Sequence, residues 1–242
     1  MSVDLPRHRS EAYLERLSER SLDAYTVKIV EYNHWHFSVL RQKLAESYLA
    51  SGYLTEDQLE QGALPDHYQD QSVVFDVQHR DTLPDEPFLA GARLLLSVPG
   101  RGLDSLQIHL LGRPNIVPEE LAVLLEQHLE RPGSIAEFAT HLMDESASPM
   151  ALIALYRSMA LYSHEQGIST WVMGLKPEVV AEYEKYTGPA MRRIGEVAEL
   201  GQLKGPFIPC VIDVKRLLPL LLPHFRMGRV ATKSLDRTRE AS

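Results

Sequence analysis

Residues 134–175 read SIAEFATHLMDESASPMALIALYRSMALYSHEQGISTWVMGL. The opening SIAEFATHLM predicts a strand, and Pro149 then starts a long apolar stretch that predicts a helix ending near Gly167. The closing ISTWVMGL predicts a second strand. A strand–helix–strand unit of this kind is a parallel crossover, which is almost always right-handed.

Further strands and helices are predicted on both sides of this unit. Strands are expected over 24–32, 72–80, 88–98, 105–112 and 207–214, and helices over 36–52, 118–130, 177–188 and near 216–223. The alternation predicts an α/β fold in which helices flank a central mixed β-sheet. We expect this domain to occupy residues 23–225, with a polar helical extension over 1–22 and a polar tail over 226–242.

Composition excludes several kinds of protein. The chain has 242 residues and a net charge of −8, so it lacks the basic footprint of a nucleic-acid partner. Cys210 is the sole cysteine, which excludes an intrachain disulfide and a cysteine-based zinc site. The N-terminal residues lack the apolar run of a signal peptide, and the most apolar stretch, 217–222, is broken by Pro219. We therefore expect a soluble, cytoplasmic protein with no membrane span and no resident metal.

Four stretches follow one another in an order known from a group of enzymes. They are HFSVLRQKLAESYLASGYL (36–54), DHYQDQSVVFDV (66–77), GARLL (91–95) and IAEFATHLM (135–143). The set resembles the acyl-homoserine-lactone (autoinducer) synthases and the long-chain N-acyl amino acid synthases, a branch of the GNAT superfamily of N-acetyltransferases. The resemblance runs over about residues 25–216. It implies a GNAT-like fold in which the strand at 134–143 diverges from the strand at 168–175.

Two features differ from the family pattern. An arginine often follows the strand glutamate, Glu137 here, but this chain has Thr140 and His141 at those places. The segment DESASP (144–149) stands where acetyltransferases commonly carry a glycine-rich pyrophosphate loop.

The resemblance implies an acyltransferase that moves an acyl group from a thioester to an amine and makes an N-acyl amino acid or a related signal. The donor would be acyl-coenzyme A or acyl-phosphopantetheine on an acyl carrier protein, used as a co-substrate and not as a permanently bound cofactor. The acceptor would be a small-molecule amine. Two other interpretations stay open: a catalytically silent module of the same fold that serves regulation or partner binding, and a peptide or short-chain N-acetyltransferase.

The chemistry of the reaction selects two candidate catalytic residues. An amine attacks a thioester only when it is neutral, and a carboxylate that accepts its proton contributes about 10²–10⁴-fold in rate. Glu137 is the first candidate and His141 a second base, and strand alternation predicts that Glu137, Ala139 and His141 lie on one face of the sheet. The structural alternatives are an ion pair for Glu137 and a hydrogen-bonded core position for His141. Backbone N–H groups of the diverging strand are expected to stabilise the oxyanion.

Substrate binding is predicted at two groups of residues. An arginine can hold an acceptor carboxylate through paired hydrogen bonds, and the acceptor-binding candidates are Arg93, Asp70 and Trp35. Arg93 has the alternative of pairing with Asp66 or Asp70. Hydroxyls and the N-terminus of the helix after 148 can bind a pantetheine or phosphate oxygen, so the donor-binding candidates are Leu142, Met143, Ser146 and Ser148.

Overall fold

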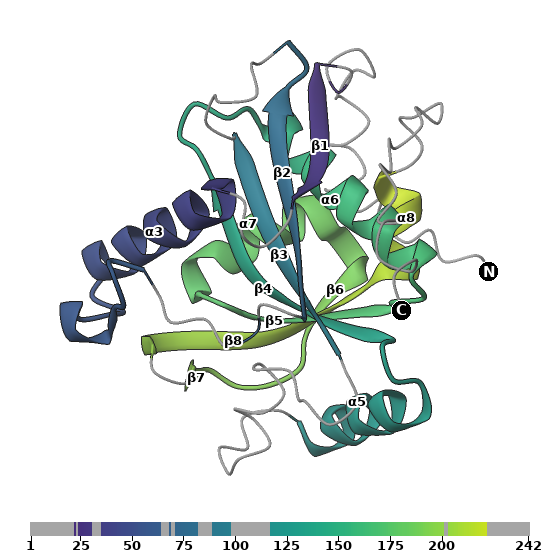
Figure 1. The fold of residues 1–242 in the computed structure, drawn as a ribbon. Coiled ribbons are helices and arrows are strands. Elements are labelled where there is room, and N and C mark those ends of the chain that lie inside the picture. Colours follow the sequence, from purple (N-terminus) through teal and green to yellow (C-terminus); the bar gives the residue numbers. More distant parts are fainter. Residues whose placement is uncertain are drawn as a thin grey trace, which may run out of the picture.

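The computed structural model describes residues 22, 24–30, 35–63, 68, 71–81, 89–97, 117–200 and 203–221. Its strands are β1 (Tyr25–Val30), β2 (Ser72–His79), β3 (Ala90–Leu96), β4 (Ile135–Met143), β5 (Thr170–Leu175), β6 (Met191–Arg193), β7 (Ala198–Leu200) and β8 (Leu203–Asp213). Its helices are α3 (Trp35–Ala50), α5 (Pro118–Glu130), α6 (Pro149–Glu165), α7 (Pro177–Thr187) and α8 (Val214–Leu221), with short 3₁₀ turns η1 (Glu56–Gln58) and η3 (Gly188–Ala190). Helices flank a central sheet (Figure 1), which confirms the predicted α/β class.

The sheet is mixed, as predicted. Its strands lie in the order β1-β2-β3-β4-β5-β8-β6, and β7 pairs with β8 beside this path. The strands β4 and β5 are parallel and are joined by the α6 crossover. The pairs β1–β2, β2–β3, β3–β4 and β5–β8 are antiparallel. The unit at 134–175 therefore forms the parallel centre of the sheet.

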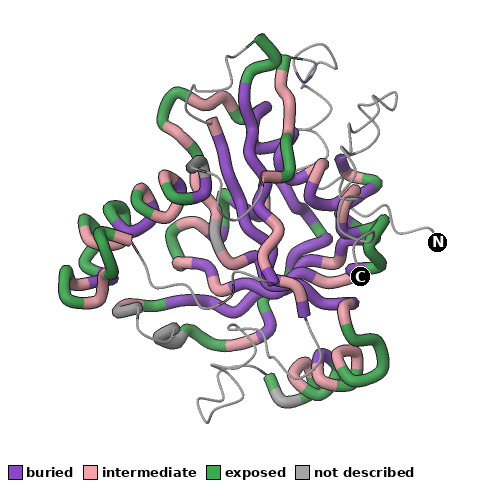
Figure 2. Tube along the Cα trace, in the orientation of Figure 1, coloured by how far each residue is buried: buried purple, intermediate pink, exposed green. Residues whose placement is uncertain are grey.

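Helices cover both faces of the sheet (Figures 1 and 2). On one face, which we call the α6 face, α6, α7 and α8 bury the largest apolar cluster, which includes Phe75, Leu94 and Trp171. On the opposite face, which we call the α3 face, two smaller clusters form around Leu124 of α5 and Phe37 of α3. Burial on both sides explains why β3 reads as an unbroken apolar run.

Close approach of α3 depends on a glycine. A Cβ built at Gly91 of β3 would lie 3.3 Å from Leu40 Cδ1 of α3, which is tighter than ordinary van der Waals contact. Leu40 is buried against Val74 at this point. Gly91, in the GARLL stretch, therefore fixes how closely α3 packs on the sheet.

Short strands near the C-terminus were not predicted. No strand was expected between 189 and 206, but residues 191–200 contain β6 and β7, and β8 begins at Leu203, before the predicted start at 207. Strands of three residues give no measurable alternation, so pairing with β8 defines them. The predicted strand over 105–112, nearly all of the 1–22 extension and the tail over 226–242 lie outside the described residues. Within the part of the chain that is described, no helix has the length and apolar character needed to cross a membrane.

Candidate active site

The central parallel pair of strands separates part-way along its length. The β4–β5 ladder holds three residue pairs, from Ile135–Thr170 to Glu137–Val172. Beyond Glu137, β4 continues to Met143 paired with β3 alone. The divergence implied by the family resemblance is therefore present, and we call the region between β4 and β5 beyond Glu137 the opening. Among the strands that the structure describes, none pairs with the edge of β4 that borders it.

A β-bulge bends β4 where it leaves β5. Across β3, Leu94 pairs with Phe138 and Arg93 pairs with Thr140, so Ala139 is an extra residue without an opposite partner. An extra residue of this kind bends and twists the strand that carries it. The bulge therefore lies just beyond the point where the β4–β5 pairing ends.

The bulge also corrects one expectation. Glu137 lies opposite Leu95 and Val172, which belong to the cluster under α5, so it faces the α3 face. His141 lies on the α6 face, where its ring centre is 5.8 Å from that of Phe138. The prediction that Glu137, Ala139 and His141 share a face is wrong for His141, because the extra residue inverts the alternation beyond it.

Two opposite charges are buried on the α3 face beside the opening. Glu137 is 6% exposed and Arg93 is 7% exposed, and the register puts them in neighbouring rows of β4 and β3. The Arg93 guanidinium lies 5.5 Å from the centre of the Phe37 ring, so α3 forms a roof over it. Burying a carboxylate and a guanidinium is costly unless both are bound, which marks this face as a polar site and not a plain core.

Sequence reasoning missed two further polar residues on this face. Asp76 and Gln78 of β2 are 2% and 1% exposed, and Gln78 accepts a hydrogen bond of 2.8 Å from Lys28 Nζ. The register places Asp76 opposite Gly91, under α3. The signal was the alternation in SVVFDVQH, which puts Asp and Gln on the face opposite the buried Phe75 and Val77.

An aromatic cluster closes the opening on the α6 face. His141 Nδ1 is 2.8 Å from the Tyr183 hydroxyl of α7, and Nε2 of the same ring is buried without a hydrogen-bond partner. The ring centre of Phe138 lies 5.8 Å from that of Trp171 and 5.9 Å from that of Tyr156. Burial lowers the pKa of His141 to about 4 and raises the pKa of Tyr183. The imidazole is therefore neutral and the phenol protonated near pH 7.

The four predicted donor-binding residues lie together at the end of β4 and the start of α6. Leu142 packs against the cluster under α3, and Met143 is 40% exposed. Ser148 Oγ accepts a hydrogen bond of 3.2 Å from the Met150 N–H, which caps α6, and lies 2.7 Å from the Tyr25 hydroxyl. The N–H and hydroxyl groups of Ser146 both donate hydrogen bonds to Asp144.

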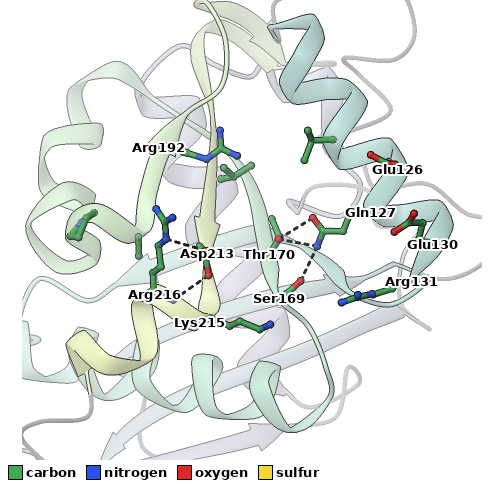
Figure 3. A pocket seen from close by; sticks show the side chains of 14 residues that line it. Glu126, Gln127, Glu130, Arg131, Ser169, Thr170, Arg192, Asp213, Lys215 and Arg216 are labelled. Atoms are coloured by element: carbon green, nitrogen blue, oxygen red, sulfur yellow. Dashed lines mark hydrogen bonds and ion pairs between the residues drawn. The ribbon is translucent and has the colours of Figure 1, made fainter.

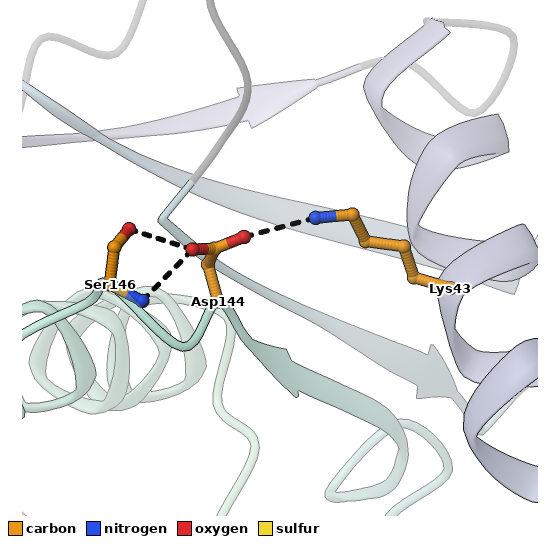
Figure 4. A network of polar contacts seen from close by, with 3 residues as sticks. All are labelled: Lys43, Asp144 and Ser146. Carbon is orange, nitrogen blue, oxygen red and sulfur yellow. Dashed lines mark hydrogen bonds and ion pairs between the residues drawn. The ribbon is translucent and has the colours of Figure 1, made fainter. Parts of the chain in front are cut away.

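Asp144 organises the turn between β4 and α6 (Figure 4). Its Oδ1 accepts hydrogen bonds from the Ser146 hydroxyl at 2.7 Å and the Ser146 N–H at 3.0 Å. Its Oδ2 accepts a hydrogen bond of 3.0 Å from Lys43 Nζ of α3. The hydrogen bonds from Ser146 and the nearby Lys43 lower the pKa of Asp144 to about 2, so its carboxylate is charged at physiological pH. Sequence reasoning missed this residue because its partner lies 101 positions away.

Helix α3 connects the far ends of the two diverging strands. The Lys43–Asp144 ion pair ties α3 to the end of β4. Lys176, which follows β5, lies 4.8 Å from the ring centre of Tyr48 and 4.0 Å from that of Tyr53. The opening is therefore covered by α3 on one face of the sheet and by α6 and α7 on the other.

Two acceptor-binding candidates stay predictions. Trp35 is the first residue of α3, but its side chain is outside the described part of the chain. Asp70 is also outside it, together with Asp66, the alternative partner of Arg93. Among the residues that are described, no group of three His, Cys, Asp or Glu is placed to hold a metal ion.

A separate cavity of about 470 Å³ lies on the α3 face at the start of β5 and the end of β8 (Figure 3). On its wall, Gln127 Nε2 of α5 donates hydrogen bonds to Ser169 Oγ at 2.8 Å and Thr170 Oγ1 at 3.0 Å. Its rim carries several cations, of which Arg216 pairs with Asp213 at 3.4 Å. None of the predicted site residues lines this cavity, so we do not place the reaction there.

The fold described above recurs in solved structures. FeeM, an N-acyl amino acid synthase from uncultured soil microbes, superposes with a TM-score of 0.57 over 83% of this chain and 96% of its own, at 16% identity. The chain has the fold of an acyl synthase. The AHL synthase LasI matches with a TM-score of 0.53 over 85% of this chain and 98% of its own, at 13% identity.

A third structure of this fold is MesI, a CoA-dependent acyl-homoserine lactone synthase. It matches with a TM-score of 0.50 over 87% of this chain and 100% of its own, at 14% identity. No protein-family model and no curated protein matches the sequence. The likeness to the acyl synthases is therefore one of fold, and the chemistry has to be argued from the residues at the opening.

Proposed function

We propose that this protein is an N-acyltransferase, which transfers an acyl group from a phosphopantetheine thioester to the amine of a small acceptor that also carries a carboxylate. The observation that carries the proposal is the end of the β4–β5 ladder at the Glu137–Val172 pair. It puts a buried carboxylate at the apex of an opening that is bordered by an edge of β4 with which no described strand pairs. The expected product is an N-acyl amino acid or a related signal.

The donor fits the free edge of β4. Edge strands pair readily with any extended chain that offers amide donors and acceptors. A pantetheine arm is such a chain, because it contains two amide groups. Pairing with residues 138–143 would bring the thioester carbonyl to the bulge, where backbone N–H groups stabilise the developing oxyanion.

The acceptor approaches from the α3 face. Arg93 is proposed to hold its carboxylate through paired hydrogen bonds, beneath the Phe37 ring. Asp70 and Trp35 are proposed to complete this subsite. The amine then lies close to Glu137, which is in the row next to Arg93 on the same face.

Glu137 is proposed to accept the proton of the attacking amine, directly or through one water. As the amine nitrogen bonds to the thioester carbon, the carbon–sulfur bond breaks and the thiolate leaves. The protonated Glu137 then passes this proton to the thiolate, directly or through one water, and returns to its carboxylate form. His141, whose pKa is lowered, and Tyr183, whose pKa is raised, form a hydrogen-bonded pair on the opposite face that does not supply the proton. Amide and thiol are the products, so atoms and charges balance.

Mass spectrometry of extracts from cells that overproduce the protein tests this function. The wild type should yield an N-acyl species that the Glu137→Gln variant lacks, because the amide cannot accept the proton. The matched control is Glu165→Gln, at the exposed end of α6, which should yield the same species as the wild type.

Thermal melting separates the alternatives for Glu137. Loss of the product with an unchanged melting temperature supports catalysis, whereas a large drop in melting temperature marks Glu137 as a structural ion-pair partner. The same N-acyl species in both extracts would contradict the role of Glu137, whereas its absence from both would contradict the proposal and favour the catalytically silent binding module.

A further inference from the structure

The turn at residues 144–148 marks the outer end of the opening. From the bulge at Ala139 to Asp144, an extended chain advances by about 17 Å at 3.3 Å per residue. An extended phosphopantetheine arm has a comparable length. A donor whose thioester lies at the bulge therefore brings its phosphate to Asp144, Glu145 and the start of α6.

The start of α6 would ordinarily attract a phosphate. Helix N-termini present free N–H groups and a partial positive charge. Here those groups are already used, because Ser148 Oγ binds the Met150 N–H and the Ser148 carbonyl binds the Ala151 N–H at 3.0 Å. The Ser146 N–H and hydroxyl are held by Asp144.

The turn is also negatively charged. Asp144 carries a permanent carboxylate, and the exposed Glu145 adds a second at the next position. Lys43 is the cation that pairs with Asp144, and this ion pair neutralises one of the two charges. A diphosphate bound at this turn would lie beside a carboxylate. In acetyltransferases with a glycine-rich pyrophosphate loop, backbone N–H groups stand at this place instead.

We infer that Asp144 is a specificity-determining residue for the acyl donor, one that disfavours the diphosphate of acyl-coenzyme A and favours an arm ending in a single phosphodiester, as on a carrier protein. The inference rests on the proposed function and names the class of its donor. Asp144 acts by repelling phosphate at this turn, which costs a diphosphate more than a single phosphodiester because the diphosphate carries more negative charge, and by engaging Lys43, a cation that could otherwise bind phosphate.

The test compares two donors that share one arm. Acyl-pantetheine carries no phosphate, whereas acyl-coenzyme A carries the diphosphate. For the wild type and for Asp144→Asn, kcat/KM is measured with both donors at low and high salt. Asp144→Asn should raise the ratio of acyl-coenzyme A to acyl-pantetheine by about three- to tenfold at low salt, and by less at high salt.

Binding of coenzyme A itself, measured by calorimetry, gives a second readout that needs no turnover. Its affinity should rise by the same factor in Asp144→Asn. Asp213→Asn is the matched control, because Asp213 also pairs with a cation, Arg216, but lies beside the separate cavity. If Asp144→Asn lowers the melting temperature, the measurements are made on Asp144→Ser, which also removes the charge.

The possible results separate the role of Asp144 from the proposed acyltransferase function. An unchanged or lowered ratio in a folded, active Asp144→Asn protein overturns the role of Asp144 and leaves the acyltransferase standing. A wild type that transfers no acyl group from either donor or from an acylated carrier protein overturns the proposed function, and the inference with it.

Discussion

The two halves of β4 differ in what lies beside them. Residues 135–137 are held between β3 and β5, whereas residues 138–143 have β3 on one edge and the opening on the other. The paired half anchors Glu137, and the free half offers backbone groups to a ligand. One strand thus supplies both a rigid support and a binding edge, and the extra residue Ala139 lies near the start of the free half.

Deletion of Ala139 is expected to have the largest effect on the difference between the two halves of β4. Phe138 and Thr140 would become neighbours and keep their present partners Leu94 and Arg93, so the register of β4 against β3 would be unchanged. The strand would lose its bend, and the opening would narrow. We expect a folded protein with a melting temperature near the wild type and transfer reduced by at least about 10²-fold, because small misplacements of reacting groups have effects of that size.

Deleting Ala136 provides the control. It lies in the regular half, so its loss would move Ile135 to the wrong face of the sheet. That variant should unfold, whereas the Ala139 deletion should not. Full transfer activity in the Ala139 deletion would show that the bulge has no part in the site.

His141 makes stability depend on pH, because its Nε2 is buried although the residue as a whole is only partly buried. The pKa of its imidazole is about 4 in the folded protein, below the ordinary 6.5, so the unfolded chain binds the proton first. The stability of the folded protein that depends on a neutral His141 is therefore present above pH 6.5 and is lost as the pH falls toward 4. We expect the wild type to lose about 2 kcal/mol more than His141→Phe between pH 7 and pH 5 in denaturant titrations.

An exposed histidine serves as the control for that titration. His164→Gln, near the end of α6, should keep the pH dependence of the wild type. Parallel pH curves for the wild type and His141→Phe would contradict the burial of the imidazole on the α6 face.

The smallest expected effect is that of Arg93→Lys. A lysine keeps the charge but loses the two parallel hydrogen bonds to a carboxylate, so KM for the acceptor should rise about tenfold, with a smaller change in kcat. Steady-state kinetics with the acceptor found by mass spectrometry measures this. An unchanged KM together with a lowered melting temperature would assign Arg93 to structure alone.

Much of this fold could be predicted because its signals are local. Pro118, Pro149 and Pro177 stand in the first turns of α5, α6 and α7, and β3 reads as a buried strand from its apolar run. The face of His141 could not be predicted, because the bulge is defined by pairing with β3. The Lys43–Asp144 contact could not be predicted either, because it joins residues that are far apart in the sequence.

Hydrogen exchange tests the central claim most directly. In the free protein, amides at 135–137 should be protected, and those N–H groups of 138–143 that border the opening should exchange faster. Adding a non-hydrolysable thioether analogue of acyl-pantetheine should then protect 138–143 selectively. No protection there, or protection confined to the cavity around Ser169 and Asp213, would contradict the assignment of the opening as the acyl-donor site.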